Sequence, residues 1–295
     1  MSMANQTNYL NFNNFDLVVA TPSQLEMLWN YNRVKNLRPK FIVVDESDVL
    51  LHFNPSLSKF LLGLISELNA DASAKVVLSA ASFPERINGK PFETFLHKYF
   101  PGMRILKSSD FLKVPSQIEH GVIESEDIDL PEKIALLVKL IPSSVDSSFI
   151  VFVRNGSHVK SIAEVLASHN ITSLGLTSEM SDTDRLYSLY RFKNGKASVL
   201  ICTDVVCRGV HIDFDCHVVQ FDCAENAVSL LHRFGRTGRM GRKGVVTTFM
   251  TQKDRPLLER FQGMIDSKND ISPIISRKRS FSKRFLESKG RTKDK

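Results

Sequence analysis

The chain has 295 residues, of which 42% are hydrophobic and 24% are charged, a composition typical of a globular protein with one large or two medium domains. Its formal net charge of +7 is compatible with a polyanionic partner such as nucleic acid. No apolar run approaches the roughly 18–20 residues that cross a bilayer, and the Asn-rich residues 1–14 contain neither Lys nor Arg. We therefore expect a soluble intracellular protein without membrane contact or leader peptide. The sequence does not distinguish between the mitochondrion, the nucleus or nucleolus, and the cytoplasm.

Strand and helix patterns alternate through the first third of the chain. A short apolar run over residues 16–20 stops at Thr21-Pro22, after which Pro22 opens a helix. The β-branched run 41–44 predicts a strand buried on both faces. An amphipathic helix over 57–68 and another apolar strand over 75–78 follow it. Strands that alternate with helices in this way indicate a parallel α/β sheet.

The alternation loosens once and then resumes. We expect a proline-containing, acidic linker over residues 114–130, between an incomplete first domain (1–113) and a second domain (131–265). Apolar runs in the second domain predict five strands: 148–153, 172–176, 198–202, 217–221 and 244–250. Periodicity then fades, so residues 266–295 are expected to form a basic, disordered tail, either solvated or attracted to RNA without sequence preference.

The most distinctive stretch, residues 232–242, carries four arginines spaced by three glycines. A solvated basic loop needs no glycine at fixed intervals, whereas these glycines permit tight turns that let the arginines converge. Arg presents a planar fork that matches phosphate oxygens, and it stabilises the charge that develops on a transferring phosphoryl group. The stretch therefore favours phosphate or nucleotide chemistry over a solvated loop.

Two pairs of polar residues directly follow predicted buried strands. Asp45-Glu46 stands at the carboxyl end of its strand, the edge at which open α/β sheets bind ligands. An Asp there can hold Mg²⁺, and the adjacent Glu can orient a water molecule. Thr203-Asp204 ends another strand, and its hydroxyl and backbone N–H groups suit a phosphate. Each pair is a weak signal by itself.

Taken together in chain order, the motifs resemble the DEAD-box family of ATP-dependent RNA helicases, in superfamily two. The motifs are Thr21-Pro22, Asp45-Glu46-Ser47-Asp48, Ser79-Ala80-Ala81, Met180 to Arg185, Thr203-Asp204-x-x-Cys207-Arg208-Gly209 and His232-Arg233-x-Gly235-Arg236-Thr237-Gly238-Arg239. The resemblance covers about residues 17–251, and the last two motifs are the most specific. It implies an α/β fold with two RecA-like parallel-sheet domains, the first incomplete, that close together on ATP, Mg²⁺ and RNA.

The resemblance also implies roles for particular residues. Asp45 would coordinate Mg²⁺ on ATP, and Glu46 would position the attacking water. The other residues at the nucleotide would be Gly209, Arg236 and Arg239, with both arginines reaching the γ-phosphate. Coupling of the ATP and RNA sites would run through Ser79 and through Asp48, which would contact the second domain with His232 as its partner. His232 would also be catalytic. The RNA backbone would be contacted, without sequence preference, by Thr21, Pro22, Arg185 and Thr203. Other expected partners are ribonucleoprotein or ribosome-assembly factors, and the expected state is a monomer.

The sequence departs from the family pattern within these motifs. The departures are Ser23-Gln24 for Gly-Arg, a small-for-small change at Ser47, Ala81 for Thr, Asp182 for Gln, Cys207 for Ala and His211 for Asp. Ala81 removes one hydroxyl of the coupling motif, and Gln24 removes one phosphate contact. We therefore expect unwinding to be weakened more than hydrolysis.

The sequence also lacks a G-x-x-x-x-G-K-[ST] motif, which in the family cradles the phosphates of ATP. We expect this chain to be part of a longer helicase and not to hydrolyse ATP productively alone. The alternative is a non-catalytic RNA-binding or decoy protein derived from a helicase, which the missing motif and the changes at Gln24, Ala81 and His211 favour. The retained residues favour the helicase: Asp45, Glu46, His232, Arg236 and Arg239.

Overall fold

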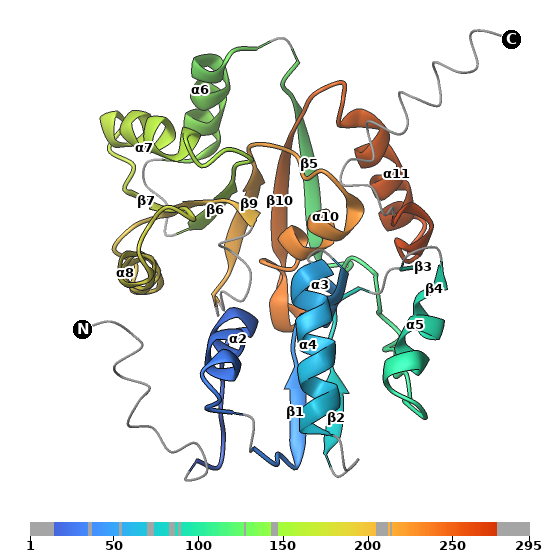
Figure 1. Ribbon diagram of the computed structural model, residues 1–295. Helices are drawn as coiled ribbons and strands as arrows, with labels where there is room; N and C mark the ends of the chain where they lie inside the picture. Colours follow the sequence, from blue (N-terminus) through green and yellow to red (C-terminus); the bar gives the residue numbers. More distant parts are fainter. Residues whose placement is uncertain are drawn as a thin grey trace, which may run out of the picture. The chain divides into compact units, whose positions relative to one another are not determined.

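The structure is a computed structural model that describes residues 15–34, 37–52, 55–69, 74–82, 86–87, 90–126, 128–142, 147–204, 212 and 214–275. Its backbone contacts divide the chain into two units, Met1–Lys107 and Ser108–Lys295, and each unit has its own sheet (Figure 1). The division falls slightly before the domain end that we expected at residue 113. Helices alternate with parallel strands in both units, which confirms the predicted α/β class.

Unit 1 is built on two parallel strands, β1 (Phe41–Val44) and β2 (Lys75–Leu78), with Val43 opposite Val77 in the register. Its helices are α2 (Pro22–Asn30), α3 (Ser47–His52), α4 (Pro55–Leu68) and α5 (Phe92–Tyr99), and the short strands β3 (Arg86–Ile87) and β4 (Lys90–Pro91) precede α5. The amphipathic helix predicted over 57–68 is α4, which buries Leu61, Leu62, Leu64 and Ile65.

One prediction for unit 1 is wrong. Strand β1 is not buried on both faces, because Phe41 and Val43 are 61% and 66% exposed. Val77, opposite Val43 in the register, is also exposed, so these side chains mark one face of the small sheet as uncovered. The apolar run 16–20 forms no strand, and Leu17 and Val19 are 78% and 85% exposed. An extended segment becomes a strand only when a neighbour satisfies its backbone groups.

Unit 2 is built on a six-stranded sheet in the order β5-β10-β9-β6-β8-β7, and every pair is parallel. The strands are β5 (Ile118–Glu124), β6 (Ser148–Phe152), β7 (Ser173–Leu176), β8 (Val199–Cys202), β9 (Cys216–Gln220) and β10 (Gly244–Met250). The helices are α6 (Leu130–Leu140), α7 (His158–Ser168), α8 (Asp182–Lys193), α10 (Ala227–Phe234) and α11 (Arg255–Asp266), with 3-10 turns η3 (Arg239–Gly241) and η4 (Ser272–Ile274). The five strands predicted from apolar runs are β6 to β10.

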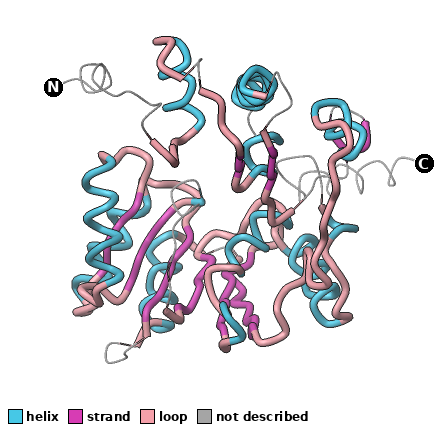
Figure 2. Tube along the Cα trace, turned by 90° about the horizontal axis from the view of Figure 1, so that it is seen from below, coloured by secondary structure: helices cyan, strands magenta, loops and turns pink. Residues whose placement is uncertain are grey.

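Helices cover both faces of the unit 2 sheet, so its strands lie between two helical layers (Figures 1 and 2). On one face α8, α10 and α11 contribute Phe192, Phe234 and Phe261 to the core. On the other face α6 and α7 contribute Leu137 and Ile162. Successive residues of a strand point to opposite faces, so the central strands need apolar residues at every position.

Two further expectations are corrected in unit 2. In place of a linker over 114–130, β5 runs beside β10 for its whole length, from Ile118 opposite Gly244 to Glu124 opposite Met250. As an edge strand, β5 buries only Ile118, and its polar exposed residues concealed it in the sequence. The expected tail is packed at its start, because Ile271 is 1% exposed and its N–H donates to the carbonyl of Leu112. Residues 276–295 lie outside the described residues.

No helix within the described ranges is both long enough and apolar enough to cross a membrane.

Candidate functional site

Thr21 and Pro22, two predicted RNA contacts, lie at the start of α2. Thr21 Oγ1 accepts a hydrogen bond from the Gln24 N–H (3.4 Å), and Gln24 Oε1 accepts one from the Thr21 N–H (3.1 Å). This reciprocal capping box satisfies two backbone donors at the helix start, and Pro22 has no N–H to satisfy. Gln24, one of the departures from the family pattern, therefore fixes the beginning of α2.

Asp45 and Glu46 form the turn between β1 and α3. Glu46 has a φ of +48°, in the left-handed region that non-glycine residues seldom adopt, and its N–H donates to Asp45 Oδ1 at 2.9 Å. Backbone strain of this kind is common at ligand-binding sites. Asp45 is exposed at the carboxyl end of β1. Its carboxylate can therefore bind Mg²⁺ jointly with nucleotide phosphates, the arrangement that Mg²⁺ favours.

A buried hydrogen-bond cluster ties the end of β1 to the end of β2. Ser47 donates from both its N–H and its Oγ to the carbonyl of Ser79, each at 2.9 Å. Asp48 is 2% exposed, and its Oδ2 accepts from the N–H (3.0 Å) and the Oγ (2.6 Å) of Ser82. Hydrogen bonds to a carboxylate are stronger than those between neutral groups, so this pair holds Asp48 in place despite its burial.

Ser82 is a site residue that the sequence-based interpretation missed. Ala81 lacks the hydroxyl expected in this motif, but Ser82, one residue later, donates a hydroxyl to Asp48. Ser79 is exposed and joins the cluster through its main chain. The signal available in the sequence was simply a Ser directly after the motif. The coupling roles of Asp48 and Ser79 remain predictions.

Three loops of unit 2 meet at the carboxyl edge of its sheet. Gly156 follows β6, Thr177 follows β7 and Thr203 follows β8. A Cβ atom placed on Gly156 would stand 3.6 Å from Thr177 Cγ2 and 4.0 Å from Thr203 Cγ2. Thr203, a predicted RNA contact, is thus grouped with two other strand ends, where hydroxyl and N–H groups suit a phosphate. Cys207, Gly209 and His211 lie outside the described residues.

Arg233 is buried, with 3% of its side chain exposed, and holds the loop after β8. Its Nε and Nη2 bind the Oδ1 (2.7 Å) and Oδ2 (2.9 Å) of Asp204 in a bidentate ion pair. Its Nη1 donates to the carbonyl of Asp222 at 2.6 Å and to Gln220 Oε1 at 3.2 Å. These bonds engage the guanidinium, so Arg233 fastens the Thr203-Asp204 loop to α10 and is not a phosphate contact.

The contacts of Arg233 continue as a polar chain across the sheet. Gln220 Nε2 donates to Thr248 Oγ1 (2.7 Å), which lies 2.9 Å from His120 Nε2, and His120 Nδ1 lies 2.8 Å from Gln262 Oε1. The amide oxygen of Gln262 can only accept, so His120 carries its proton on Nδ1 and accepts from Thr248. Burial lowers the pKa of His120, although the hydrogen bond with Gln262 opposes this shift, and the imidazole is neutral.

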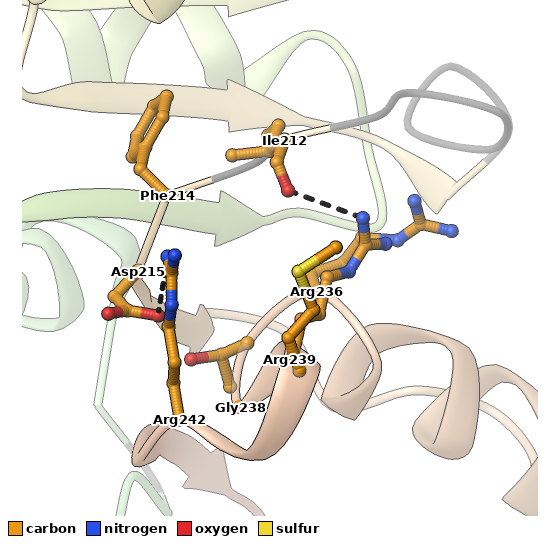
Figure 3. A pocket seen from close by; sticks show the side chains of 9 residues that line it. Ile212, Phe214, Asp215, Arg236, Gly238, Arg239 and Arg242 are labelled. Carbon is orange, nitrogen blue, oxygen red and sulfur yellow. Dashed lines mark hydrogen bonds and ion pairs between the residues drawn. The ribbon is translucent and has the colours of Figure 1, made fainter.

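Arg236 and Arg239 line one pocket of unit 2, together with Ile212, Phe214 and Asp215 (Figure 3). Arg239 is held there because its Nε donates to the carbonyl of Gly235 (2.8 Å) and its Nη1 to the carbonyl of Ile212 (3.3 Å). Both arginines therefore take part in the predicted convergence.

The other two arginines of the motif differ in their positions. Arg242 also lines the pocket, where its Nη1 lies 3.9 Å from Asp215 Oδ1, whereas Arg233 is buried against Asp204. The predicted need for glycine is confirmed at Gly238, which has a φ of +62° and whose Cβ would stand 2.6 Å from the side chain of Ile118. Three of the four arginines, Arg236, Arg239 and Arg242, thus line one pocket.

Arg185, a predicted RNA contact, lies near the start of α8 and forms an ion pair with Asp182. The helix begins at Ser181, whose Oγ accepts from the Asp184 N–H (3.1 Å) and donates to Asp184 Oδ2 (2.6 Å). The carboxylate of Asp182 is therefore engaged with Arg185, and that of Asp184 is engaged with Ser181.

The predicted site residues are divided between the two units. Unit 1 carries Thr21, Pro22, Asp45, Glu46, Asp48 and Ser79, and unit 2 carries Arg185, Thr203, His232, Arg236 and Arg239. His232 is half-buried in the last turn of α10, and its predicted partnership with Asp48 remains a prediction. No group of three or more His, Cys, Asp or Glu side chains suited to a metal occurs among the described residues. A magnesium site at Asp45 would therefore rely on nucleotide phosphates for other ligands.

Comparison with known proteins gives a consistent result. The family model "Helicase conserved C-terminal domain" matches residues 132–241. The chain is 31% identical over 266 residues to the DEAD-box ATP-dependent RNA helicase RhpA of Helicobacter pylori, covering 88% of this chain and 51% of the relative. It is 29% identical over 263 residues to the ATP-dependent rRNA helicase RRP3 of Yarrowia lipolytica, covering 88% and 52%. The chain thus spans about half the length of these relatives.

Solved structures show the same fold. S. cerevisiae Dbp5 L327V bound to RNA and ADP BeF3 has a TM-score of 0.73 at 23% identity, covering 85% of this chain and 64% of that one. DEAD-box helicase Mss116 bound to ssRNA and UDP-BeF has a TM-score of 0.74 at 19% identity, covering 92% and 55%. The predicted RecA-like parallel-sheet fold is confirmed.

Proposed function

The chain belongs to the DEAD-box family of RNA helicases, and on this premise we propose that it serves in RNA-stimulated ATP hydrolysis that locally unwinds or remodels RNA. Because the sequence contains no G-x-x-x-x-G-K-[ST] motif, the proposal applies to the chain together with a segment that supplies such a phosphate-binding loop. The chain would contribute the acidic motif of the ATP site, the arginines and most of the RNA contacts.

Residues from both units would bind ATP and assist the attack of water on its γ-phosphate. Asp45 would bind Mg²⁺, which when present with ATP neutralises phosphate charge, and Glu46 would orient the attacking water. Arg236 and Arg239 would stabilise the charge that develops on the γ-phosphoryl group. Gly209 would lie at the nucleotide as well. The exposed Asp45 carboxylate and the arginine-lined pocket support these roles.

RNA would be contacted along its backbone, so recognition would not depend on sequence. Thr203 lies at a strand end, where hydroxyl and N–H groups suit a phosphate. Thr21 and Pro22 lie at the start of α2, where the Thr21 hydroxyl accepts from Gln24 and can still donate its own hydrogen, and Arg185 adds a positive charge. Asp48, Ser79 and His232 would couple ATP to RNA.

The hydrogen-bond cluster at Ser47, Asp48, Ser79 and Ser82 is the observation that carries the proposal. It joins segments more than thirty residues apart in the sequence, directly after the Asp45-Glu46 turn. A movement of that turn on hydrolysis would therefore reach the end of β2 through hydrogen bonds.

A second candidate function is non-catalytic RNA binding by unit 2. The absence of the phosphate-binding motif from the sequence favours it. Ribonucleoprotein or ribosome-assembly factors are proposed partners in either case, by analogy with the rRNA helicase relative, and the proposed state is a monomer.

The test compares RNA-stimulated ATP hydrolysis by this chain alone and by the chain mixed with the amino-terminal half of a relative's first domain, which carries the missing loop. Hydrolysis that requires both parts and RNA, and that Glu46→Gln abolishes while RNA binding persists, supports the helicase. RNA binding with no hydrolysis in any mixture, and no effect of Glu46→Gln, supports the binding protein. If neither RNA binding nor hydrolysis occurs, both candidate functions are wrong.

A further inference from the structure

Arg185 has a carboxylate partner on its own helix. We propose that Asp182 holds Arg185 in an ion pair that must open before Arg185 contacts an RNA phosphate, so that Asp182 lowers the affinity of the chain for RNA. The inference rests on the proposed function, in which Arg185 is an RNA contact, and it makes Asp182 an affinity-setting residue of that site.

The geometry of α8 brings the two side chains together. Asp182 is the first residue of the helix and Arg185 lies three residues later, a spacing that places both on one side of the first turn. Arg185 Nη2 donates to Asp182 Oδ1. The two side chains are 33% and 80% exposed, so the pair lies where a solvent-borne anion can reach it.

A phosphate and the Asp182 carboxylate compete for the same donors. Both present two oxygen atoms to the planar guanidinium, which forms its strongest hydrogen bonds with such pairs of oxygens. When RNA takes Arg185, the Asp182 carboxylate is left beside the phosphate as a like charge. An exposed ion pair is itself worth little, so this residual repulsion is the larger effect. Two unit charges about 5 Å apart in water change an affinity roughly fourfold.

The ion pair also predicts a change in salt dependence. Binding of single-stranded nucleic acid releases about 0.7 cation for each phosphate that a positive side chain neutralises. With Asp182 present, the phosphate, Arg185 and Asp182 together keep a net charge of one negative unit. The cation bound near that phosphate is therefore not released from the RNA. Replacing Asp182 by Asn therefore steepens the slope of log affinity against log salt by up to about 0.7.

Asp184 offers a matched control on the same helix turn. It carries the same charge, but its carboxylate accepts from the Ser181 hydroxyl at 2.6 Å, and no contact of Asp184 with Arg185 is found among the described residues. Asparagine retains an acceptor for that hydroxyl. Asp184→Asn thus changes the net charge by the same amount as Asp182→Asn without releasing Arg185.

The experiment measures binding of a fluorescein-labelled oligouridylate to the full chain by anisotropy, over a series of KCl concentrations. Asp182→Asn is expected to bind roughly fourfold more tightly at low salt, with the steeper slope, and Asp184→Asn to match the wild type more closely. In the Arg185→Ala background, Asp182→Asn is expected to lose most of its gain. Thermal unfolding of each variant checks that α8 remains folded.

Equal gains from Asp182→Asn and Asp184→Asn, or an undiminished gain in the Arg185→Ala background, would show a general charge effect and overturn the inference while RNA binding stands. Wild-type affinity that Arg185→Ala leaves unchanged would also overturn it. Absence of RNA binding by the wild type and by every variant would instead refute the proposed function, and the inference with it.

Discussion

Asp48 is a carboxylate taken out of water, at 2% exposure, and Ser82 is one of the residues that hold it. Ser82 gives it one hydrogen bond from the main chain and one from the hydroxyl. Removing a partner from a buried charged group costs more than the bond itself contributes, because the group loses water without compensation. Ala81 lacks a hydroxyl, but the adjacent Ser82 supplies one, and it donates to Asp48.

Ser82→Ala is expected to destabilise unit 1 by about 1–3 kcal/mol, since Asp48 would keep only its main-chain donor from that residue. Ser79→Ala is the matched control, and a change below about 0.5 kcal/mol is expected there because Ser79 is exposed and bonds through its carbonyl. Urea unfolding of both variants measures the difference. Equal effects of the two substitutions would contradict the role given to the Ser82 hydroxyl.

Strands and helices of unit 2 are joined by half-buried histidines as well as by apolar packing. His120 on β5 contacts Thr248 on β10 and Gln262 on α11, and His217 on β9 lies 2.8 Å from Thr247 Oγ1 on β10. Burial is the main cause of a lowered pKa in both imidazoles. Three neighbouring strands and one helix thus depend on these rings being neutral.

This arrangement predicts that acid destabilises unit 2. His120 and His217 protonate near pH 6.5 in the unfolded chain, whereas in the folded chain burial lowers the pKa of both, so that they protonate only at lower pH. The unfolded state therefore binds more protons as the pH falls below about 6.5, and the free energy of unfolding decreases. Urea unfolding at pH 7.5 and 5.5 measures this loss. His120→Gln is expected to reduce the pH dependence, whereas His169→Gln, at an exposed position, is expected to leave it unchanged.

Elements with strong apolar patterns were predictable from the sequence, and those defined by a neighbour were not. Strands β6, β8 and β9 are apolar because they are covered on both faces, so their pattern alone identified them. Strand β5 exists because β10 pairs with it, and residues 16–20 form no strand because no partner is present among the described residues. Pairing is a tertiary property that a local pattern does not contain.

The candidate site was predictable to a similar extent. The motif positions identified the acidic turn and Arg236 with Arg239, and the structure brings both into exposed or pocket-lining positions. The side-chain partners that are distant in sequence were not predictable. That Arg233 binds Asp204 and that Ser82 binds Asp48 depends on tertiary geometry that spacing does not determine.

At the scale of the molecule the two units differ in how much core they possess. Unit 2 has a six-stranded sheet with a buried apolar cluster on each face. Within the described part of unit 1, the parallel sheet has two strands, and Phe41, Val43 and Val77 are exposed on them. A small sheet with one uncovered face gains less from burial, so the two units should differ in stability.

We therefore expect the units to unfold in separate steps, unit 1 first. Backbone amides of β1 and β2 should exchange with deuterium faster than those of β6 and β9, because local stability follows buried contacts. Limited proteolysis should leave a resistant fragment that begins near Ser108. Residues 108–275 expressed alone provide the control, and they should retain the slow exchange of β6 and β9. A single unfolding transition with uniform exchange across both units would contradict this prediction.

The uncovered face of β1 and β2 has a consequence for the behaviour of concentrated solutions. Val43 and Val77 are adjacent in the register and both exposed, so they form an apolar strip beside a strand edge that is unpaired among the described residues. Such edges recruit other strands, and like charge on the molecules, here +7, opposes their approach. Added salt screens that repulsion. High salt is therefore expected to reduce the colloidal stability of the chain, so that handling it calls for dilute protein and moderate ionic strength.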